Sequence, residues 1–493
     1  MFTRREMFQT TARMGAAATL PLLANSTLAR ESVENEVNDA QSRLNPTQVH
    51  SILRPTTVEQ IQGALREVHN SGRAISMAGG RHAMGGQQFG RDTVLLDMNQ
   101  FSRVTSLDQE DGRIEVEAGI QWPELIDFLH RQQVDANKPW AIRQKQTGVD
   151  RVSIGGSLAS NIHGRGLRFP PLISDIESLV LLDAQGKLQT CSRRENAELF
   201  SLAIGGYGMF GVITHVTLRL VPRTKVQRVV EVIAVKDLLP RVEDRLQNGY
   251  VYGDCQYSPD LTTDAAAHPG LFSCYRPVAE DMHVSKGQRH LSVADWAQLY
   301  SLARTDKKKA FERYSQHYLA SSGQVYGSDT QQLSNAFEGY RDAVDEKRDT
   351  EMITEVYVTK EAFNPFMSQV RKDFLKHEVD LTYGTIRFIE KDSESFLAWA
   401  TDSLVCIVCN LHVVHTEEGK RKAIADFRRI IDRVIEHGGH YYLTYHRWAT
   451  RKQVETCYPQ FVEFLRLKKK YDPQERFQSN WYRHYKRMFA DVI

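Results

Sequence analysis

Short runs of alternating hydrophobic and polar residues, separated by helical patches, fill residues 46–222. The stretch GVITHVTLRLVP alternates as a half-buried strand does, with Ile213 and His215 on one side and Val212 and Thr214 on the other. Helical spacing predicts helices over VEQIQGALREVHNSG, PELIDFLHRQ and ENAELFSLAIGG. DIESLVLLD and GKLQTCS are expected to pair as a hairpin. Strands and helices without a regular βαβ repeat indicate an α+β fold.

Residues 223–450 have a different pattern and are expected to form a second domain. A charged helical stretch, ADWAQLYSLARTDKKKAFERYSQHYLA, precedes the strand-like runs MITEVYVT, LTYGTIRFIE, LVCIVCNLHVVH and HYYLTYHRW. Helix-like stretches lie between these runs, which predicts an antiparallel sheet backed by helices. The tail FVEFLRLKKKYDPQERFQSNWYRHYK is expected to be helical, with a turn at Asp472-Pro473.

The first 29 residues have the layout of an export signal. TRREMFQ is charged, the run from Met14 to Ala24 is weakly apolar, and small residues end the segment at Ala29. The apolar run is too short to span a bilayer. Thr3-Arg4-Arg5 resembles the twin-arginine signal, which predicts export of the folded protein to the periplasm. The alternative is an amphipathic arm on a cytoplasmic protein.

The composition excludes several classes of protein. Of the 493 residues, 25% are charged and 41% hydrophobic, which is typical of soluble globular domains and not of disordered or polytopic membrane proteins. The chain has 63 basic and 61 acidic side chains, and removing residues 1–29, with three arginines and one glutamate, leaves 60 of each. A neutral body predicts no nucleic-acid partner, and no integral membrane span is expected beyond the signal. Six cysteines are too few for a disulfide scaffold at this length.

Two glycine-rich loops carry the densest chemical signal. SMAGGRHAMGGQQFG follows a predicted strand and contains His82, and TGVDRVSIGGSLASNIHGRG contains His163. Glycine lets backbone N–H groups point into a concavity and lets a flat or anionic ligand approach closely. Loops this long usually carry function, so they predict a site for such a ligand. The alternative is a pair of ordinary strand connections.

Two further motifs are misleading. GYGMFG at 206–211 matches GxGxxG, but a helix precedes it and a strand follows, the reverse of a nicotinamide-binding loop. CIVCNLHVVH places cysteine and histidine three residues apart, and in a strand that spacing alternates faces, so its four potential ligands do not converge on a metal. No Gly-x-Ser-x-Gly motif is present, which argues against that hydrolase class.

The two loops, together with RPTTVEQIQGAL, GGYGMFGVITHVTLRLVP and YDPQERFQSNW, resemble the vanillyl-alcohol-oxidase superfamily. Its FAD-binding domain is of the p-cresol methylhydroxylase (PCMH) type. Within the superfamily the chain most resembles the sugar-lactone and alditol oxidases, the branch of the D-arabinono-1,4-lactone oxidases. The resemblance implies a two-subdomain PCMH-type FAD-binding domain over 46–222, a substrate (cap) domain over 223–450, and a C-terminal segment, 451–493, that returns to the FAD domain.

The resemblance also implies which residues hold FAD. The backbone of residues 78–82 would bind the pyrophosphate, the segment 153–163 would contact the flavin and its phosphates, and Ile213 would lie beside adenine and ribose. His82 occupies the position that in this branch bonds covalently to the flavin 8α-methyl group. The expected cofactor residues are Ala78, Gly79, Gly80, Arg81, His82, Ala83, Gly148, Ser153, Gly155, Gly156, Ser157, Ser160, Asn161, His163 and Ile213.

The substrate side of the resemblance is partial. The branch has a Glu-x-Arg strand over the flavin, and here TIR keeps Arg387 but has Thr385 in place of the glutamate. The late His-Trp-Gly-Lys motif is stretched to HRWA at 446–449, without the lysine. Arg387 is expected to polarise the substrate oxygen, and a residue nearby to accept the hydroxyl proton. The candidates for that second role are His446 or Tyr445, with Glu355 and His412 as second choices.

The implied activity is that of an FAD-dependent oxidoreductase, which takes a hydride from the CH–OH group of a sugar-like alcohol or aldonolactone onto flavin N5. Oxygen, or a respiratory quinone or cytochrome, would then reoxidise the flavin. Because the glutamate and the lysine are missing, a second hypothesis keeps the fold but makes the protein a flavin-dependent reductase or lyase-like synthase acting on a lipid or sterol-type substrate. A third hypothesis is a binding protein without turnover.

Overall fold

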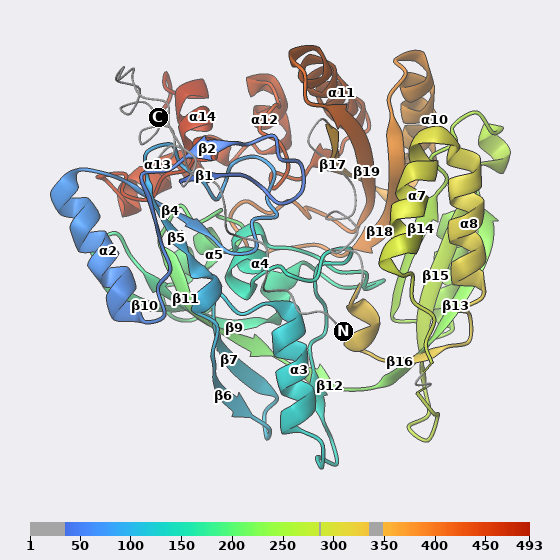
Figure 1. Cartoon of the computed structure of the whole chain (residues 1–493), viewed down its shortest axis with the longest axis horizontal. Coiled ribbons are helices and arrows are strands. Elements are labelled where there is room, and N and C mark those ends of the chain that lie inside the picture. The colour runs from blue at the N-terminus through green and yellow to red at the C-terminus, as the bar shows by residue number, and fades with distance from the viewer. Residues whose placement is uncertain (1–34, 285–286, 335–348) are drawn as a thin grey trace, which may run out of the picture.

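The computed structural model describes residues 35–284, 287–334 and 349–493 (Figure 1). The elements of the N-terminal half, blue to green, lie on one side of the molecule, and the strands of the large sheet lie on the other. The predicted export signal, residues 1–29, lies outside the described residues. Helices and strands are mixed in both halves, and an antiparallel sheet fills the C-terminal half, which confirms the predicted α+β class.

A small parallel sheet carries the first glycine-rich loop. Helix α2 (Val58–Ser71) connects β3 to β4, the first two strands of this sheet in chain order. It begins at Thr57, whose side chain accepts a hydrogen bond from the Gln60 amide. The helix ends at Gly72, where φ is 69°, a conformation that glycine adopts without strain. Three strands form this sheet, in the order β3 (Ser51–Leu53), β5 (Val94–Asp97) and β4 (Ile75–Ala78). The first glycine-rich loop therefore leaves the sheet at the carboxyl end of β4.

A five-stranded antiparallel sheet forms the second layer of this half. Burial alternates along β11 (Val212–Arg219), which confirms the alternation predicted from the sequence. The predicted hairpin is also confirmed, because β9 and β10 pair antiparallel. The sheet order is β10 (Leu188–Ser192), β9 (Ile176–Leu182), β11, β7 (Arg113–Glu117) and β6 (Val104–Asp108).

Shorter elements complete the N-terminal half. The predicted helices are confirmed as α3 (Trp122–Gln132) and α5 (Ala197–Ala203), and α4 (Ile154–Ser160) is a short helix within the second glycine-rich loop. Two-residue strands form two small antiparallel pairs: β1 (Glu36–Val37) with β2 (Thr47–Gln48), and β8 (Trp140–Ala141) with β12 (Val221–Pro222).

One eight-stranded antiparallel sheet organises the C-terminal half. Its strands, in sheet order, are β16 (Val325–Gly327), β13 (Lys225–Ala234), β15 (Pro269–Val278), β14 (Tyr252–Tyr257), β18 (Leu381–Ile389), β19 (Leu404–Val414), β17 (Asp349–Val358) and β20 (His440–Tyr441).

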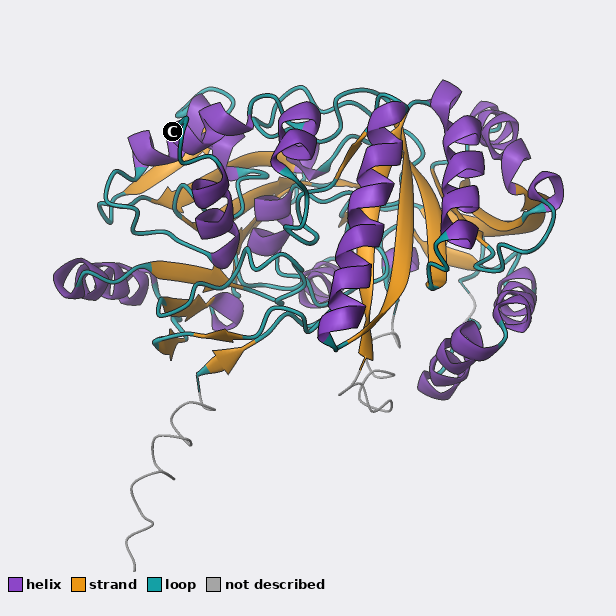
Figure 2. Ribbon diagram, turned by 90° about the horizontal axis from the view of Figure 1, so that it is seen from above, coloured by secondary structure: helices purple, strands orange, loops and turns teal. Residues whose placement is uncertain are grey.

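Helices cover the large sheet (Figure 2). Helices α10 (Lys360–Lys376) and α11 (Glu417–Glu436) pack against β17 and β19. The helical stretch predicted after residue 292 is two helices, α7 (Val293–Thr305) and α8 (Lys307–Leu319), which contact β18 and β13. The break falls at Asp306, because its side chain accepts a hydrogen bond from the Lys309 amide and so begins a new helix. Helix α6 (Leu238–Gln247) follows β13.

The prediction of a strand over HYYLTYHRW was wrong for most of its length. Only β20 forms there, and the backbone then leaves the sheet as a turn at residues 442–445. The amide of Tyr442 makes the last bond to β17, at the Glu355 carbonyl, and beyond it the amide of Met84 donates to the Thr444 carbonyl. Contact with the first glycine-rich loop thus replaces continued pairing in the sheet.

The C-terminal tail lies against the small parallel sheet. Its helices are α12 (Arg451–Cys457), α13 (Phe461–Tyr471) and α14 (Asn480–Met488). Phe477 bridges Ile75 in parallel, and the Asn480 amide donates to the Phe89 carbonyl at 2.6 Å. The domain boundaries at residues 222 and 450 stay a prediction. None of the helices in the described part of the chain combines the length and apolar character that crossing a membrane requires.

Candidate functional site

The first glycine-rich loop forms one wall of a cavity of about 180 Å³. Arg81 has a φ of 60°, and its Nη2 donates to Asp97 Oδ2 at 2.9 Å, which ties the loop to the end of β5. His82 lies among the lining residues. The predicted cofactor residues that line the cavity from this loop are Ala78, Gly79, Gly80, Arg81, His82 and Ala83.

The second glycine-rich loop closes over the first. A Cβ on Gly79 would lie 2.0 Å from Ser153 Oγ, and a Cβ on Gly80 would lie 2.1 Å from the Arg151 carbonyl oxygen. Only glycine permits this approach, so the two loops form a narrow cradle of backbone. The predicted residues that line the cavity from this side are Ser153, Gly155, Gly156 and Ser160.

The third glycine loop, GYGMFG, contributes to the same cavity. Tyr207, Gly208 and Gly211 line it together with the predicted Ile213. The motif therefore forms part of the cavity wall. It is not of the nicotinamide-binding type, because a helix precedes it and a strand follows. The turn after β20 supplies Tyr442 and Thr444 to the opposite wall. Nothing local in the sequence of that turn marks these two residues as ligand contacts.

Four predicted cofactor residues do not line this cavity. Gly148 lines the neighbouring cavity instead. Ser157 Oγ accepts a hydrogen bond from Trp122 Nε1 at 3.0 Å, and the Asn161 side-chain amide donates to Asp392 at 2.9 Å. His163 is buried beneath the cavity floor and bonds to Glu355. Ser157, Asn161 and His163 thus hold neighbouring elements together, because their side chains point away from the glycine cradle.

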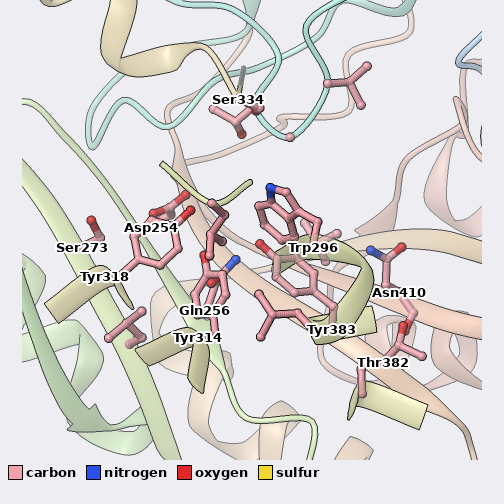
Figure 3. A pocket seen from close by; sticks show the side chains of 18 of the residues that line it. Asp254, Gln256, Ser273, Trp296, Tyr314, Tyr318, Ser334, Thr382, Tyr383 and Asn410 are labelled. Atoms are coloured by element: carbon pink, nitrogen blue, oxygen red, sulfur yellow. The ribbon is translucent and has the colours of Figure 1, made fainter. Parts of the chain in front are cut away.

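A second cavity, of about 260 Å³, lies between the large sheet and helices α7 and α8 (Figure 3). Arg387, Glu355 and Tyr445 line it, so the structure brings three predicted catalytic residues together. Five residues line both cavities, so the two are adjacent: Gln41, Gln146, Val149, Ile353 and Tyr445.

Glu355 is the centre of a buried hydrogen-bond cluster beneath the junction of the cavities. His163 Nε2 lies 2.6 Å from its Oε1, and Tyr357 donates to the same oxygen at 2.5 Å. Tyr445 donates to Oε2 at 2.9 Å, and the Cys406 thiol donates to Oε1 at 3.2 Å. The cluster joins the second glycine-rich loop to strands β17 and β19 and to the turn that carries Tyr445.

Charge explains the geometry of this cluster. Burial by itself would raise the pKa of Glu355, but His163, Arg387 and the Tyr357 hydroxyl outweigh it and lower the pKa to about 2. Glu355 is therefore an anion. His163 Nδ1 lies 3.0 Å from the Gly164 carbonyl oxygen and Nε2 lies 2.6 Å from the carboxylate, so the ring is held between two acceptors.

Arg387 brings a second positive charge to the cavity. It is 7% exposed, and its Nε has no hydrogen-bond partner among the described residues. Burial would lower the pKa of the guanidinium, but Cys406 and Glu355 more than offset it, so the group stays charged. A buried cation with an open donor is suited to hold an oxygen on which negative charge develops.

Tyr445 is the side chain that reaches from the Glu355 cluster to both cavities. Burial and the adjacent Glu355 carboxylate hold the pKa of Tyr445 well above its ordinary value, so its phenol stays protonated. The hydroxyl donates a hydrogen bond to Glu355. The lone pairs of its oxygen are therefore available to accept a hydrogen bond from a ligand.

The structure does not bring His446 or His412 to either cavity. His446 is 2% exposed and stacks on Trp448 with ring centroids 4.0 Å apart, and burial beside Arg447 lowers its pKa to about 3. His412 bonds to Asp380 through Nδ1 at 3.1 Å, near the C-terminal end of the inner strand β19. Both positions were expected to face the substrate, but the chain turns after β20 and β19 extends past the cavity, so neither contacts it.

Cys406 and Cys409 lie on opposite faces of β19, as the alternation of a strand requires. Cys406 contacts Glu355, and Cys409 lies 3.2 Å from the Tyr257 hydroxyl. The ligand atoms of His163, Glu355 and Cys406 lie within 4.8 Å of one another. Burial and the Glu355 charge hold the pKa of Cys406 well above its ordinary value, so the sulfur stays a thiol. The thiol donates a hydrogen bond to Glu355, which is also the partner of His163.

Part of the chain that lines the first cavity matches a known family. Residues 49–192 match the FAD binding domain family. L-gulonolactone oxidase of Bos taurus is 29% identical over 194 residues, which is 39% of this chain and 42% of that protein. D-arabinono-1,4-lactone oxidase of Debaryomyces hansenii is 27% identical over 203 residues, 38% of this chain and 35% of that protein. Cytokinin dehydrogenase 10 of Oryza sativa subsp. japonica is 31% identical over 206 residues, which is 40% of this chain and 36% of that protein. The match thus spans about two fifths of the length of the bovine protein.

Proposed function

Because residues 49–192 are an FAD binding domain, we propose that the protein is an FAD-linked oxidoreductase that oxidises the CH–OH group of a sugar-like alcohol or aldonolactone. The observation that carries the proposal is the junction of the two cavities, where Tyr445 and Ile353 line both. A substrate in the second cavity would meet the flavin at this junction. The names of the bovine and yeast relatives, both lactone oxidases, support the class of substrate.

The residues of the first cavity fit FAD. Gly79 and Gly80 pack directly against Ser153 and Arg151 and also line the cavity, where a bare backbone lets a pyrophosphate approach closely. Ser153 and Ile213 would lie along the same ligand, and Tyr207 would close its wall. Bound FAD would supply the hydride acceptor, flavin N5, and the protein supplies position and charge.

Arg387 and Tyr445 are the groups that we assign to the substrate. The guanidinium of Arg387 would hold the substrate oxygen and stabilise negative charge there. Tyr445 Oη would accept a hydrogen bond from the substrate hydroxyl and so fix the direction of the C–H bond, and the hydroxyl proton would be released to water as the hydride leaves. Glu355 is a positioning residue and not a base, because its pKa is low and it already accepts four hydrogen bonds.

Replacing Tyr445 by phenylalanine is expected to slow substrate-dependent flavin reduction by about 100-fold, because misplacement of the reacting group by a small distance costs a factor of this size. Bound FAD should be retained, since the ring itself is kept. The measurement is rapid-mixing absorbance of the flavin without oxygen. The matched control is His446→Asn, the next residue along, which lies outside both cavities and should reduce at the wild-type rate. Equal losses in the two variants would contradict the assignment.

We also propose that His82 bonds covalently to the flavin. Its position among the residues that line the FAD cavity supports this, together with the resemblance of its loop to the sugar-lactone oxidases. Acid denaturation of the wild-type protein should leave the yellow colour in the pellet, whereas His82→Ala should release it into the supernatant. Release of all the colour from the wild type would show that FAD is bound without a covalent link. The periplasmic location and the electron acceptor stay predictions from the sequence.

A further inference from the structure

The second cavity extends far beyond the junction with the FAD cavity. Paired residues share one face of a sheet, and register places Gln256 beside Thr385, Thr385 beside Val408, and Val408 beside Glu355. Ser273 lies one strand further out, beside Asp254. Four strand-to-strand steps separate Glu355 from Ser273, or roughly 19 Å at about 4.8 Å per step. This floor is several times longer than the single sugar ring or lactone that the reaction requires.

Aromatic rings from α7 and α8 form the roof over the outer part of this floor (Figure 3). Trp296 and Tyr314 have ring centroids 6.4 Å apart, and Tyr314 and Tyr318 follow at 4.4 Å. All three are only partly buried although they line the cavity. The row leads outward to Arg228 on β13, whose guanidinium lies 5.2 Å from the Tyr318 ring. Flat apolar faces therefore continue past the reacting end.

The floor opposite these rings is polar and short of hydrogen-bond donors. Ser273 Oγ, Gln256 Oε1 and Asn410 Oδ1 are buried and have no partner among the described residues. Ser273 and Asn410 are 6% and 8% exposed. Buried polar atoms are normally paired, and a carbonyl oxygen of an amide can be paired only by a donor. The cavity therefore fits a ligand that carries several donating hydroxyl groups spread along its length.

Charge at the outer end is mixed, because Arg165, Arg228, Arg289 and Asp254 all line the cavity. Arg228 is already engaged, because Nε and Nη2 donate to the Tyr275 hydroxyl and Nη1 donates to Ser321 Oγ. Asp254 lies 4.0 Å from Arg165 Nη1, so these two charges offset each other. A purely apolar group would leave the three polar atoms of the floor unpaired, at a cost in free energy for each. A neutral ring with hydroxyl groups on its edge and C–H groups on its face satisfies both the floor and the roof.

We propose that the outer part of the second cavity binds a second sugar ring, so that the substrate is a disaccharide-sized or longer glycoside of the polyol or lactone that is oxidised. This inference rests on the proposed function, which places the oxidised carbon at the Tyr445 end. The aromatic rings cover the C–H face of the second ring, and Ser273 and Gln256 accept or exchange hydrogen bonds with its hydroxyl groups, whereas Asn410, on β19, lies nearer the reacting end.

The test compares matched substrates of one and two rings on the FAD-loaded protein. The pairs are D-glucitol with maltitol, and D-glucono-1,5-lactone with cellobiono-1,5-lactone, and the readout is kcat/KM for flavin reduction. For the wild type we expect the two-ring member to be favoured by about 10- to 100-fold, the effect of one stacking contact and one or two hydrogen bonds. Trp296→Ala should bring the ratio close to one and leave the one-ring substrate unchanged, and Trp296→Phe should restore part of the preference.

The matched control is Gln298→Ala, on the exposed side of the same helix. Equal kcat/KM for the two sizes, or an equal loss for both sizes in Trp296→Ala, would overturn the inference while the proposed function stands. If no polyol or lactone of either size reduces the flavin, the proposed function fails. Calorimetric titration of the oxidised protein with the same ligands then decides the inference. Tighter binding of the two-ring ligands, lost in Trp296→Ala, supports it. Equal binding, no binding, or a preference for benzyl alcohol overturns it.

Discussion

Replacing Arg387 by methionine is expected to slow flavin reduction by substrate about 100- to 1,000-fold, the usual cost of removing one donor that stabilises developing negative charge. Arg387 is a buried cation whose Nε has no hydrogen-bond partner among the described residues, so a substrate oxygen can take that place. Methionine keeps most of the volume and removes the charge. The visible spectrum should show that FAD is still bound, because Arg387 lines the second cavity and not the first.

Two comparison variants separate the charge of Arg387 from its shape. Arg387→Lys keeps a cation but loses the planar arrangement of donors, so it should recover only part of the rate. His412→Asn changes a polar residue on the neighbouring strand that lines neither cavity, and it should reduce at the wild-type rate. A wild-type rate in Arg387→Met would remove Arg387 from the proposed mechanism.

Replacing Glu355 by glutamine is expected to lower the free energy of unfolding by about 3–5 kcal/mol, the cost of leaving one member of a buried ion pair alone. The His163 ring is 1% exposed and would lose its 2.6 Å carboxylate partner. Denaturant unfolding at neutral pH measures the loss. The double variant with His163→Gln should recover part of it, because the partner left unpaired is then removed as well.

The pH dependence of this difference has a definite sign. The pKa of Glu355 is lowered from 4.5 to about 2 on folding, so its contribution to stability is fully present above pH 4.5. As the pH falls from 4.5 toward 2, the carboxylate is protonated and the contribution is lost. The wild type and Glu355→Gln should therefore converge in stability over that range. A difference at neutral pH below about 0.5 kcal/mol, the scatter of ordinary surface changes, would contradict the account of the cluster.

The sequence was sufficient to predict the parts of the fold whose signal is local. Alternation identified β11, and turn residues between two β-rich runs identified the pair β9 and β10. The glycines of the FAD cradle were predictable because each loop places several of them together, and Gly79 and Gly80 do lie against the second loop. The turn at 442–445 was not predictable, since its aromatic and β-branched residues favour a strand and contact with Met84 and Glu355 decides otherwise.

The second cavity could not be predicted from the sequence, for a geometric reason. Asp254, Ser273 and Asn410 lie far apart in the chain and come together only through the register of four strands of the large sheet. Single polar residues in apolar strands carry no signal of their own. The role of His163 was also hidden, because its loop indicates a cofactor contact while its side chain is directed to Glu355.

The most direct test of the proposed function is the anaerobic reduction of the bound flavin. The purified, FAD-loaded protein is mixed with aldonolactones and alditols in the absence of oxygen, and the flavin absorbance is followed. The account predicts complete bleaching by at least one of them, at a rate that falls in Arg387→Met and Tyr445→Phe. A flavin that stays oxidised with every such compound, while a chemical reductant bleaches it, would contradict the proposal and favour the reductase or synthase hypothesis for this fold.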